Sequence, residues 1–207
     1  MKLFDILFGR TKPAPSNLEG VFAMATAHLT LQAKGELKPD RRAALCFRPV
    51  QSSYFAEGEA ELEDVLKLSL REAGTRYRIE KDSYGYRWVV LEDEQFEDLV
   101  AALHLSGRAL ADKGFRDQLL AAVYRFTGEE GPVYFIYNYK RGKYYPFVPK
   151  GGAIPLRGSP GPGGTGIKGD KQERDHGLEL RLRALMEREL PLEPQLEQWY
   201  PLWGLPL

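Results

Sequence analysis

Residues 119–147 read LLAAVYRFTGEEGPVYFIYNYKRGKYYPF, and this stretch decides the fold class. Its first two β runs, residues 119–127 and 133–139, are apolar on both faces, which is typical of central strands. A third run, residues 144–148, contains Pro146, which cannot donate to a β ladder and therefore indicates an edge strand. Only a short K-R-G-K turn separates the last two runs, so the strands it joins must be antiparallel.

The remaining elements surround this β meander. Apolar residues at helical spacing predict helices that begin near Leu18 and that cover residues 52–73, 94–113 and 175–190. Further β runs are expected at residues 43–50, 77–82 and 86–92. The order of elements predicts a single α+β domain, in which an antiparallel sheet of about five to six strands carries its helices mainly on one face.

Composition places the chain among soluble globular proteins. It has 207 residues, of which 43% are hydrophobic and 28% are charged. Lys and Arg total 29, as do Asp and Glu, so the formal net charge is zero. A dedicated nucleic-acid binder needs surplus cations to displace counterions from phosphate, so no nucleic-acid partner is expected.

Local composition divides the chain into four regions. We expect an N-terminal apolar segment and linker at residues 1–15 and an α+β core at residues 16–150. A flexible Gly/Pro-rich loop is expected at residues 151–170, because these residues are almost devoid of large apolar side chains. Residues 171–207 are expected to form a C-terminal helix and an aromatic tail that pack on the core.

The residues that usually carry chemistry are sparse. Cys46 is the single cysteine and lies in a β-like run, so it is expected to be a small buried hydrophobe. One cysteine forms no internal disulfide, which favours a reducing compartment. The glycines before Lys168 lack the spacing of a phosphate-binding loop. We therefore expect no metal, no cofactor and no enzymatic reaction.

Targeting signals are also missing from the pattern. No apolar run approaches the length of about 20 residues that crosses a bilayer. Asp5 interrupts the short apolar stretch at the N-terminus, and no small-residue cleavage site follows it. These features predict a cytoplasmic protein. Such a protein could still contact the inner face of the cell membrane peripherally.

Three clusters are candidate contact surfaces for a partner or a membrane. The first is an N-terminal apolar cluster, the second is a basic, tyrosine-bearing hairpin, and the third is an aromatic C-terminal tail. Their members are Leu3, Phe4, Ile6, Leu7 and Phe8; Lys140, Arg141, Lys143, Tyr144 and Tyr145; and Trp199, Tyr200 and Trp203. Cross-strand packing of the tyrosines and core packing of the tail residues are the alternatives.

Five sequence blocks are distinctive: FGRTKP at residues 8–13, DSYGYRW at 82–88, YKRGKYYPF at 139–147, RDHGLEL at 174–180 and WYPLWG at 199–204. Together they resemble the PspA-associated protein PspAB family. The long Gly/Pro-rich stretch before Arg174 departs from the family pattern. The resemblance implies a small cytoplasmic protein of bacteria or archaea that belongs to the phage-shock system, in which PspA protects a stressed membrane.

The sequence as a whole thus predicts a non-enzymatic interaction protein of a PspA-type membrane-stress response. Its expected partners are PspA or a related phage-shock accessory protein, together with the anionic membrane surface near which it would dock. A chaperone-like module that binds peptides at an exposed sheet edge is an alternative. A hydrolase with an unrecognised site is another.

Overall fold

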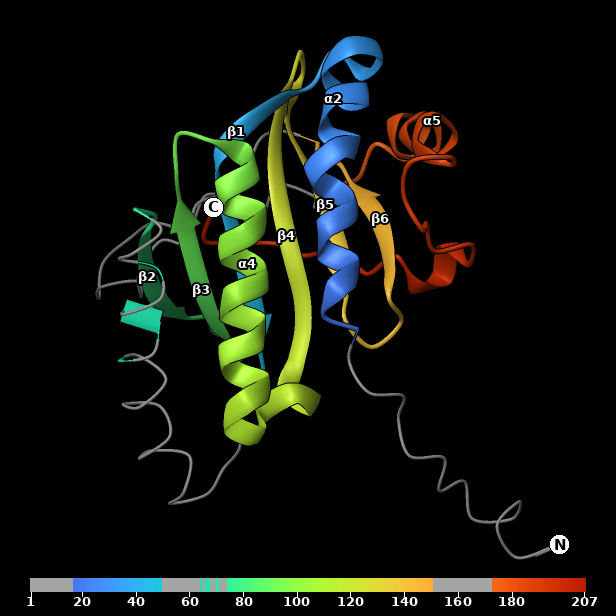
Figure 1. Cartoon of the computed structure of the whole chain (residues 1–207). Helices are drawn as coiled ribbons and strands as arrows, with labels where there is room; N and C mark the ends of the chain where they lie inside the picture. Colours follow the sequence, from blue (N-terminus) through green and yellow to red (C-terminus); the bar gives the residue numbers. More distant parts are fainter. Residues whose placement is uncertain (1–16, 50–63, 65, 68–69, 71–73, 151–172) are drawn as a thin grey trace, which may run out of the picture.

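The computed structural model describes residues 17–49, 64, 66–67, 70, 74–150 and 173–207, which form an α+β domain around one antiparallel sheet (Figure 1). The strands are β1 (Lys38–Phe47), β2 (Arg76–Lys81), β3 (Arg87–Glu92), β4 (Leu119–Gly128), β5 (Gly131–Asn138) and β6 (Lys143–Phe147). They form a six-stranded sheet in the order β2-β3-β1-β4-β5-β6. The predicted fold class is confirmed.

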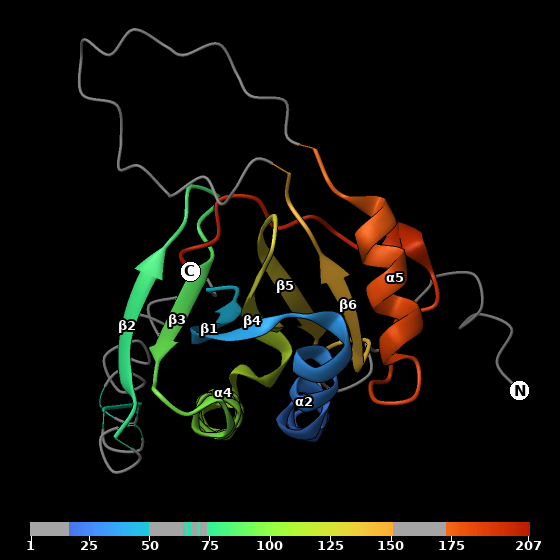
Figure 2. The same ribbon diagram turned by 90° about the horizontal axis from the view of Figure 1, so that it is seen from above.

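The helices lie mainly on one face of the sheet. A 3₁₀ turn, η1 (Glu19–Ala23), leads into α2 (Met24–Gly35), and α4 (Phe96–Leu110) follows β3. Figure 2 shows α2 and α4 side by side below the sheet, whereas α5 (His176–Met186) lies beside β6. We call the side covered by α2 and α4 the helix face of the sheet.

The meander that decided the fold class is formed as predicted. Strands β4 and β5 pair along eight positions, and β5 pairs with β6 so that Tyr137 lies opposite Tyr144. Strand β6 is the last strand of the sheet, so Pro146 occupies an edge position. Turn lengths and one proline are therefore sufficient to predict this half of the sheet.

Strand β1 begins earlier and ends earlier than predicted. Its first residues, Lys38 and Pro39, pair with Thr127 and Phe126 near the end of β4, and an irregularity separates them from the regular ladder that begins at Ala43. Polar residues before Ala43 hid this extension, because one bulge interrupts the alternation that marks a strand. Inserted between β3 and β4, β1 joins the hairpin of β2 and β3 to the meander.

The helix predicted over residues 52–73 lies mostly outside the described residues. Asp64, Leu66, Lys67 and Leu70 are described and helical, and the side chains of Leu66 and Leu70 are fully buried. The residue that follows the predicted helix, Gly74, has a φ of +77°, a conformation that favours glycine.

The opposite side of the sheet, which we call the tail face, is covered by the end of the chain. Figure 2 shows the trace after α5 crossing this face from β6 towards β2. The guanidinium of Arg78 on β2 donates a 2.8 Å hydrogen bond to the carbonyl oxygen of Pro206, which fixes the far end of the crossing. The buried residues of this face and of the tail form one cluster that includes Ala44, Val90, Val123, Ile136, Tyr145, Trp199, Leu205 and Leu207.

Candidate functional site

The basic turn between β5 and β6 is held by the side chain of Asn138. Its Oδ1 accepts hydrogen bonds from the main-chain N–H groups of Lys140 at 3.0 Å and Arg141 at 3.2 Å. Gly142 has a φ of +62°, which lets the chain reverse. The turn is thus a fixed loop whose Lys140 and Lys143 side chains are both partly exposed.

Arg141 is engaged within the chain. Its guanidinium makes a two-pronged ion pair with Glu193, with Nη2 2.9 Å from Oε1 and Nε bonded to Oε2. Glu193 is 1% exposed, and its hydrogen bond from Arg141 lowers the pKa of that carboxyl against the opposing effect of burial. Arg141 therefore anchors the segment after α5 while its side chain stays 38% exposed, so its contact with a partner stays a prediction.

Tyr144 and Tyr145 are core residues, which corrects the expectation that they form contact surface. Tyr144 is fully buried on the helix face, and its hydroxyl donates to the carbonyl oxygens of Gly20 at 3.0 Å and Val21 at 2.9 Å. Tyr145 is 3% exposed on the tail face and donates to the carbonyl oxygen of Tyr200 at 3.0 Å. Burial raises the pKa of both phenols.

Buried tyrosine hydroxyls clamp the main chain at the start of η1. Tyr137 donates to the carbonyl oxygen of Asn17 at 3.0 Å, and Tyr124 donates to that of Val21 at 3.0 Å. The N–H of Asn17 in turn donates to the carbonyl oxygen of Tyr139 at 2.9 Å. The described chain therefore begins at a fixed point beside the basic turn.

Sequence reasoning missed this clamp, although part of the signal was present. Tyr137 and Tyr139 are two residues apart in the β run predicted at residues 133–139, so strand alternation places their side chains on one face. Gly20 gives no such signal, yet a Cβ there would lie 2.0 Å from the Tyr137 hydroxyl oxygen. Desolvation of the Tyr137 phenol raises its pKa to about 12, in keeping with a neutral hydrogen-bond donor.

The predicted N-terminal contact residues lie outside the described residues. These are Leu3, Phe4, Ile6, Leu7 and Phe8. The structure does describe Asn17, the residue through which this N-terminal segment is joined to the rest of the chain. A Cβ on Gly142 would lie 3.3 Å from the side-chain nitrogen of Asn17, so that attachment point and the basic turn are in contact.

The aromatic C-terminal tail splits into buried and exposed members. Trp199 is 4% exposed and donates from Nε1 to the carbonyl oxygen of Glu193 at 3.1 Å. Tyr200 is 53% exposed. Trp203 is partly exposed, and its ring meets Phe147 edge-on with ring centroids 5.0 Å apart. Core packing therefore accounts for Trp199, while Tyr200 and Trp203 reach the surface.

Arg174 and Glu179, in the RDHGLEL block, make a buried ion pair. Glu179 is fully buried, and the guanidinium nitrogens of Arg174 lie 3.0 and 2.9 Å from its two carboxylate oxygens. Glu179 also accepts the N–H of Val148 at 2.9 Å, and Arg174 donates to the carbonyl oxygen of Trp199 at 2.7 Å. This block therefore has a structural role that joins β6, α5 and the tail.

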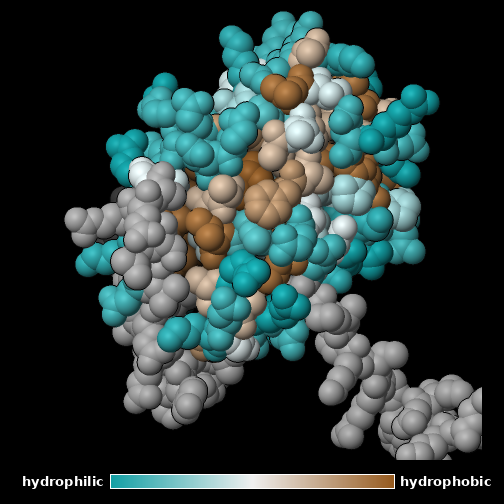
Figure 3. Space-filling view, in the orientation of Figure 1, coloured by the Kyte–Doolittle hydropathy of each residue, from teal (hydrophilic) through white to brown (hydrophobic). Residues whose placement is uncertain are grey.

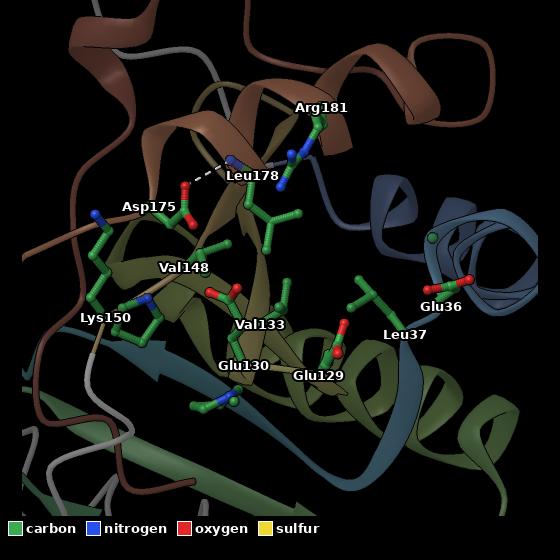
Figure 4. Close-up of a pocket in the computed structure, with 15 residues that line it drawn as sticks. Glu36, Leu37, Glu129, Glu130, Val133, Val148, Lys150, Asp175, Leu178 and Arg181 are labelled. Atoms are coloured by element: carbon green, nitrogen blue, oxygen red, sulfur yellow. Dashed lines mark hydrogen bonds between the residues drawn. The ribbon is translucent and has the colours of Figure 1, made fainter.

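One pocket, of about 430 Å³, lies where the ends of β4, β6 and α2 approach the start of α5 (Figure 4). Figure 4 shows Asp175 and Leu178 on one side of it and Leu37 on the other, with Glu129 and Val133 between them. Asp175 is occupied as the cap of α5, because it accepts the N–H of Leu178 at 2.9 Å. Acidic side chains outnumber basic ones in its lining, so its electrostatic field favours cationic groups.

A second pocket, of about 370 Å³, lies between the β2–β3 turn and the C-terminal tail, and we call it the aromatic pocket. Two of the sequence blocks on which the family resemblance rests meet there. The described residues that line it are Cys46, Asp82, Ser83, Tyr84, Tyr86, Trp88, Leu120, Ala121, Pro201, Leu202, Trp203, Gly204 and Leu205. Cys46 is 5% exposed, and burial, with a smaller effect of the Asp82 charge, raises the pKa of its thiol.

The outer side of the helix layer carries an apolar patch (Figure 3). Phe22 and Leu29 on the α2 side are 42% and 57% exposed, and Leu105 on α4 is 41% exposed. The ring of Phe22 packs on His104 with centroids 4.5 Å apart. The outward side of α2 thus exposes Leu29 beside polar residues such as Thr26 and Gln32, and Phe22 lies just before α2 in η1.

Two kinds of site were sought among the described residues. Within that part of the chain, His, Cys, Asp and Glu side chains do not gather in groups of three or more that could hold a metal ion. None of the helices described there is long and apolar enough to cross a bilayer.

Comparison with known proteins gives one match. Neither the curated proteins nor the solved structures include a significant match to this chain. A family model described as PspA associated protein B matches residues 1–157 and 167–207. The unmatched residues, 158–166, read GSPGPGGTG and lie in the Gly/Pro-rich stretch that departs from the family pattern. Because that model covers nearly the whole chain, this protein belongs to the PspA associated protein B family.

Proposed function

We propose that this protein is a non-enzymatic accessory of a PspA-type membrane-stress, or phage-shock, response. It acts in the cytoplasm, at the inner face of the cell membrane, by docking on PspA. Membership in the PspA associated protein B family supports PspA as the partner. The surface that docks is the entry surface, which we define as Asn17, Lys140 and Lys143 together with the chain that precedes Asn17.

The observation that carries this proposal is the clamp on Asn17. Its N–H and its carbonyl oxygen are both held, by Tyr139 and Tyr137, at 2.9 and 3.0 Å. Nine residue steps separate Phe8 from Asn17, and an extended chain spans at most about 3.6 Å per residue. Phe8 is thus tethered within roughly 32 Å of Asn17, and Leu3, fourteen steps away, within roughly 50 Å of it.

Neither the apolar N-terminal residues nor the two lysines supply enough binding energy alone. Burying five large apolar side chains contributes on the order of 10 kcal/mol, and ordering eight residues costs about 1–2 kcal/mol for each residue. The two quantities nearly cancel, so the apolar residues need a second source of binding energy. Lysines beside their attachment point supply it against an acidic protein surface or an anionic membrane.

The test is co-sedimentation of the purified protein with PspA and, separately, with anionic vesicles. The Lys140→Ala/Lys143→Ala double variant should bind anionic vesicles about 30-fold more weakly, since each lysine near such a surface is worth about 1 kcal/mol. Its co-sedimentation with PspA should also fall. Deletion of residues 1–10 should weaken both interactions.

The matched control removes the same charge elsewhere. Lys34 and Lys38 are exposed near the opposite end of α2, so Lys34→Ala/Lys38→Ala should bind as the wild type does. If the Lys140/Lys143 variant binds PspA and vesicles as tightly as this control, the entry surface is not the docking surface.

A peptide-binding module that uses the outer edge of β6 is less well supported. The outer edge of β6 is occupied by the chain itself, because the N–H of Tyr144 donates to the carbonyl oxygen of Pro191 at 2.9 Å. The N–H of Glu193 donates back to the carbonyl oxygen of Tyr144 at 2.8 Å.

A further inference from the structure

We propose that the aromatic pocket binds the guanidinium side chain of an arginine supplied by another protein. The pocket lies at the β2–β3 turn and the tail, and the entry surface lies at the turn between β5 and β6. The arginine site therefore goes beyond the docking proposed above and does not require PspA to be the protein that supplies the arginine.

Aromatic rings dominate the lining of the pocket and remain accessible. Tyr84, Tyr86, Trp88 and Trp203 all contribute to it. Tyr84 is 82% exposed, Tyr86 is 37% exposed and Trp203 is partly exposed. The face of an aromatic ring carries negative partial charge and attracts cations, most strongly for tryptophan.

Asp82 adds a formal negative charge to these rings. Its Oδ1 accepts the main-chain N–H groups of Tyr84 and Tyr86, each at 2.9 Å, and its Oδ2 accepts Nε1 of Trp88 at 2.9 Å. These three donors are neutral, so they orient the carboxylate without cancelling its charge. A carboxylate offers about four acceptor positions, which leaves one for a ligand.

The charges around the pocket favour a cation. Asp82 is the sole charged side chain among the described residues that line it. Arg78, which contacts Pro206 at the end of the tail, pairs with Glu80 at 2.5 Å. An entering cation therefore meets one carboxylate and the three exposed or partly exposed rings of Tyr84, Tyr86 and Trp203, and it meets no basic side chain among those lining residues.

The apolar part of the lining suits the stem of an arginine. Leu120, Ala121 and Leu202 can pack against methylene groups, as apolar surfaces do when long cationic side chains lie along them. A guanidinium is planar, stacks on aromatic rings and is more weakly hydrated than an ammonium group. These properties make arginine, rather than lysine, the expected occupant.

The test titrates the full-length protein with N-acetyl-arginine methylamide and with its neutral counterpart, N-acetyl-citrulline methylamide. The readout is the indole N–H resonances of the three tryptophans in the NMR spectrum. The resonance of Trp203 should shift, and that of Trp88 should respond through its hydrogen bond to Asp82. Trp199 does not line the pocket and serves as an internal reference. The arginine probe should bind about 2- to 30-fold more tightly than the citrulline probe.

Two variants separate binding from folding. Asp82→Asn removes the charge, and Tyr84→Ala removes a ring that is 82% exposed and so is not needed for packing. Both variants should bind the arginine probe more weakly, with an affinity close to that for the citrulline probe. Tyr200→Ala removes an exposed ring that does not line the pocket and should leave binding unchanged.

Three outcomes would overturn the assignment. They are equal binding of the arginine and citrulline probes, shifts that persist unchanged in both Asp82→Asn and Tyr84→Ala, and tighter binding of choline than of the arginine probe. The last outcome would assign the pocket to a lipid headgroup. The Lys140→Ala/Lys143→Ala variant should keep the arginine site, so failure of one proposal is distinguishable from failure of the other.

Discussion

The two faces of the sheet are covered in different ways. On the helix face, α2 and α4 bury apolar residues that recur every three or four positions, among them Met24, Ala27 and Leu31 of α2. On the tail face, the covering segment includes only a short 3₁₀ turn, η4 (Leu196–Gln198), and is held by individual polar contacts. Helices with a regular apolar period are held by many residues, whereas the irregular tail depends on a few polar contacts.

Two buried carboxylates anchor the segment that leads from β6 and α5 into the tail. Glu179 and Glu193 are both buried, and each is paired with one arginine. A buried carboxylate that loses its partner costs far more free energy than a lost apolar contact at the rim of a core. We therefore expect single substitutions of anchors to disturb the tail face more than single substitutions disturb the helix face.

The largest expected effect is at Arg174. Arg174→Ala leaves the buried Glu179 with only the ring of His176, 3.2 Å away, as an ion-pair partner, and it removes the 2.7 Å hydrogen bond to Trp199. Breaking a buried ion pair typically lowers the free energy of unfolding by about 3–5 kcal/mol. Urea denaturation followed by tryptophan fluorescence measures this change. Arg181→Ala removes an exposed arginine from α5, the helix that contains Glu179, and should shift stability by less than about 0.5 kcal/mol.

On the helix face, the sharpest test is Gly20→Ala. The added Cβ would lie 2.0 Å from the Tyr137 hydroxyl oxygen and 2.6 Å from its ring carbon Cζ, so the clamp on η1 must shift. Overpacking of this kind costs about 1–3 kcal/mol. The Tyr137→Phe background removes the nearer atom, so the alanine should cost less there. An equal loss of stability from Gly20→Ala in the wild-type and Tyr137→Phe backgrounds would show that the contact with the Tyr137 hydroxyl does not cause the loss.

The smallest expected effect concerns Arg141 and Glu193, and it depends on pH. The hydrogen bond from Arg141 lowers the pKa of Glu193 in the folded protein. Stability from this pair is therefore present above the ordinary glutamate pKa of 4.5 and is lost as pH falls below it. Urea midpoints of the wild type and Glu193→Gln should differ at pH 7, and the difference should shrink as the pH is lowered below 4.5. A difference that grows on acidification would contradict this account.

The contrast between the faces explains what could be predicted from the sequence. Strands β4, β5 and β6 and helix α4 follow from apolar periodicity, from the K-R-G-K turn and from Pro146, all of which act within one segment of chain. The buried positions of Trp199 and Tyr145 depend on contacts between segments that are distant in sequence. No local pattern reports such contacts, so their exposure could not be settled in advance.

Contacts between distant segments also limited the prediction of the candidate site. Lys140 and Lys143 could be identified as cations of a turn, because a turn between two apolar strands reaches the surface. The engagement of Arg141 could not, since its partner Glu193 lies 52 residues further along the chain. The pairing of the Asn17 attachment point with that turn likewise depends on Tyr137 and Tyr139, whose hydroxyl and carbonyl partners only the folded chain reveals.

The most direct test of the account is hydrogen–deuterium exchange of the full-length protein with and without PspA. The account predicts that PspA slows exchange in residues 1–16 and in the turn at residues 140–143, because these segments dock together. It also predicts little change in α5, whose contacts are internal. Protection confined to α5 or to the β2–β3 turn, with the entry surface exchanging as fast as in the free protein, would contradict the account.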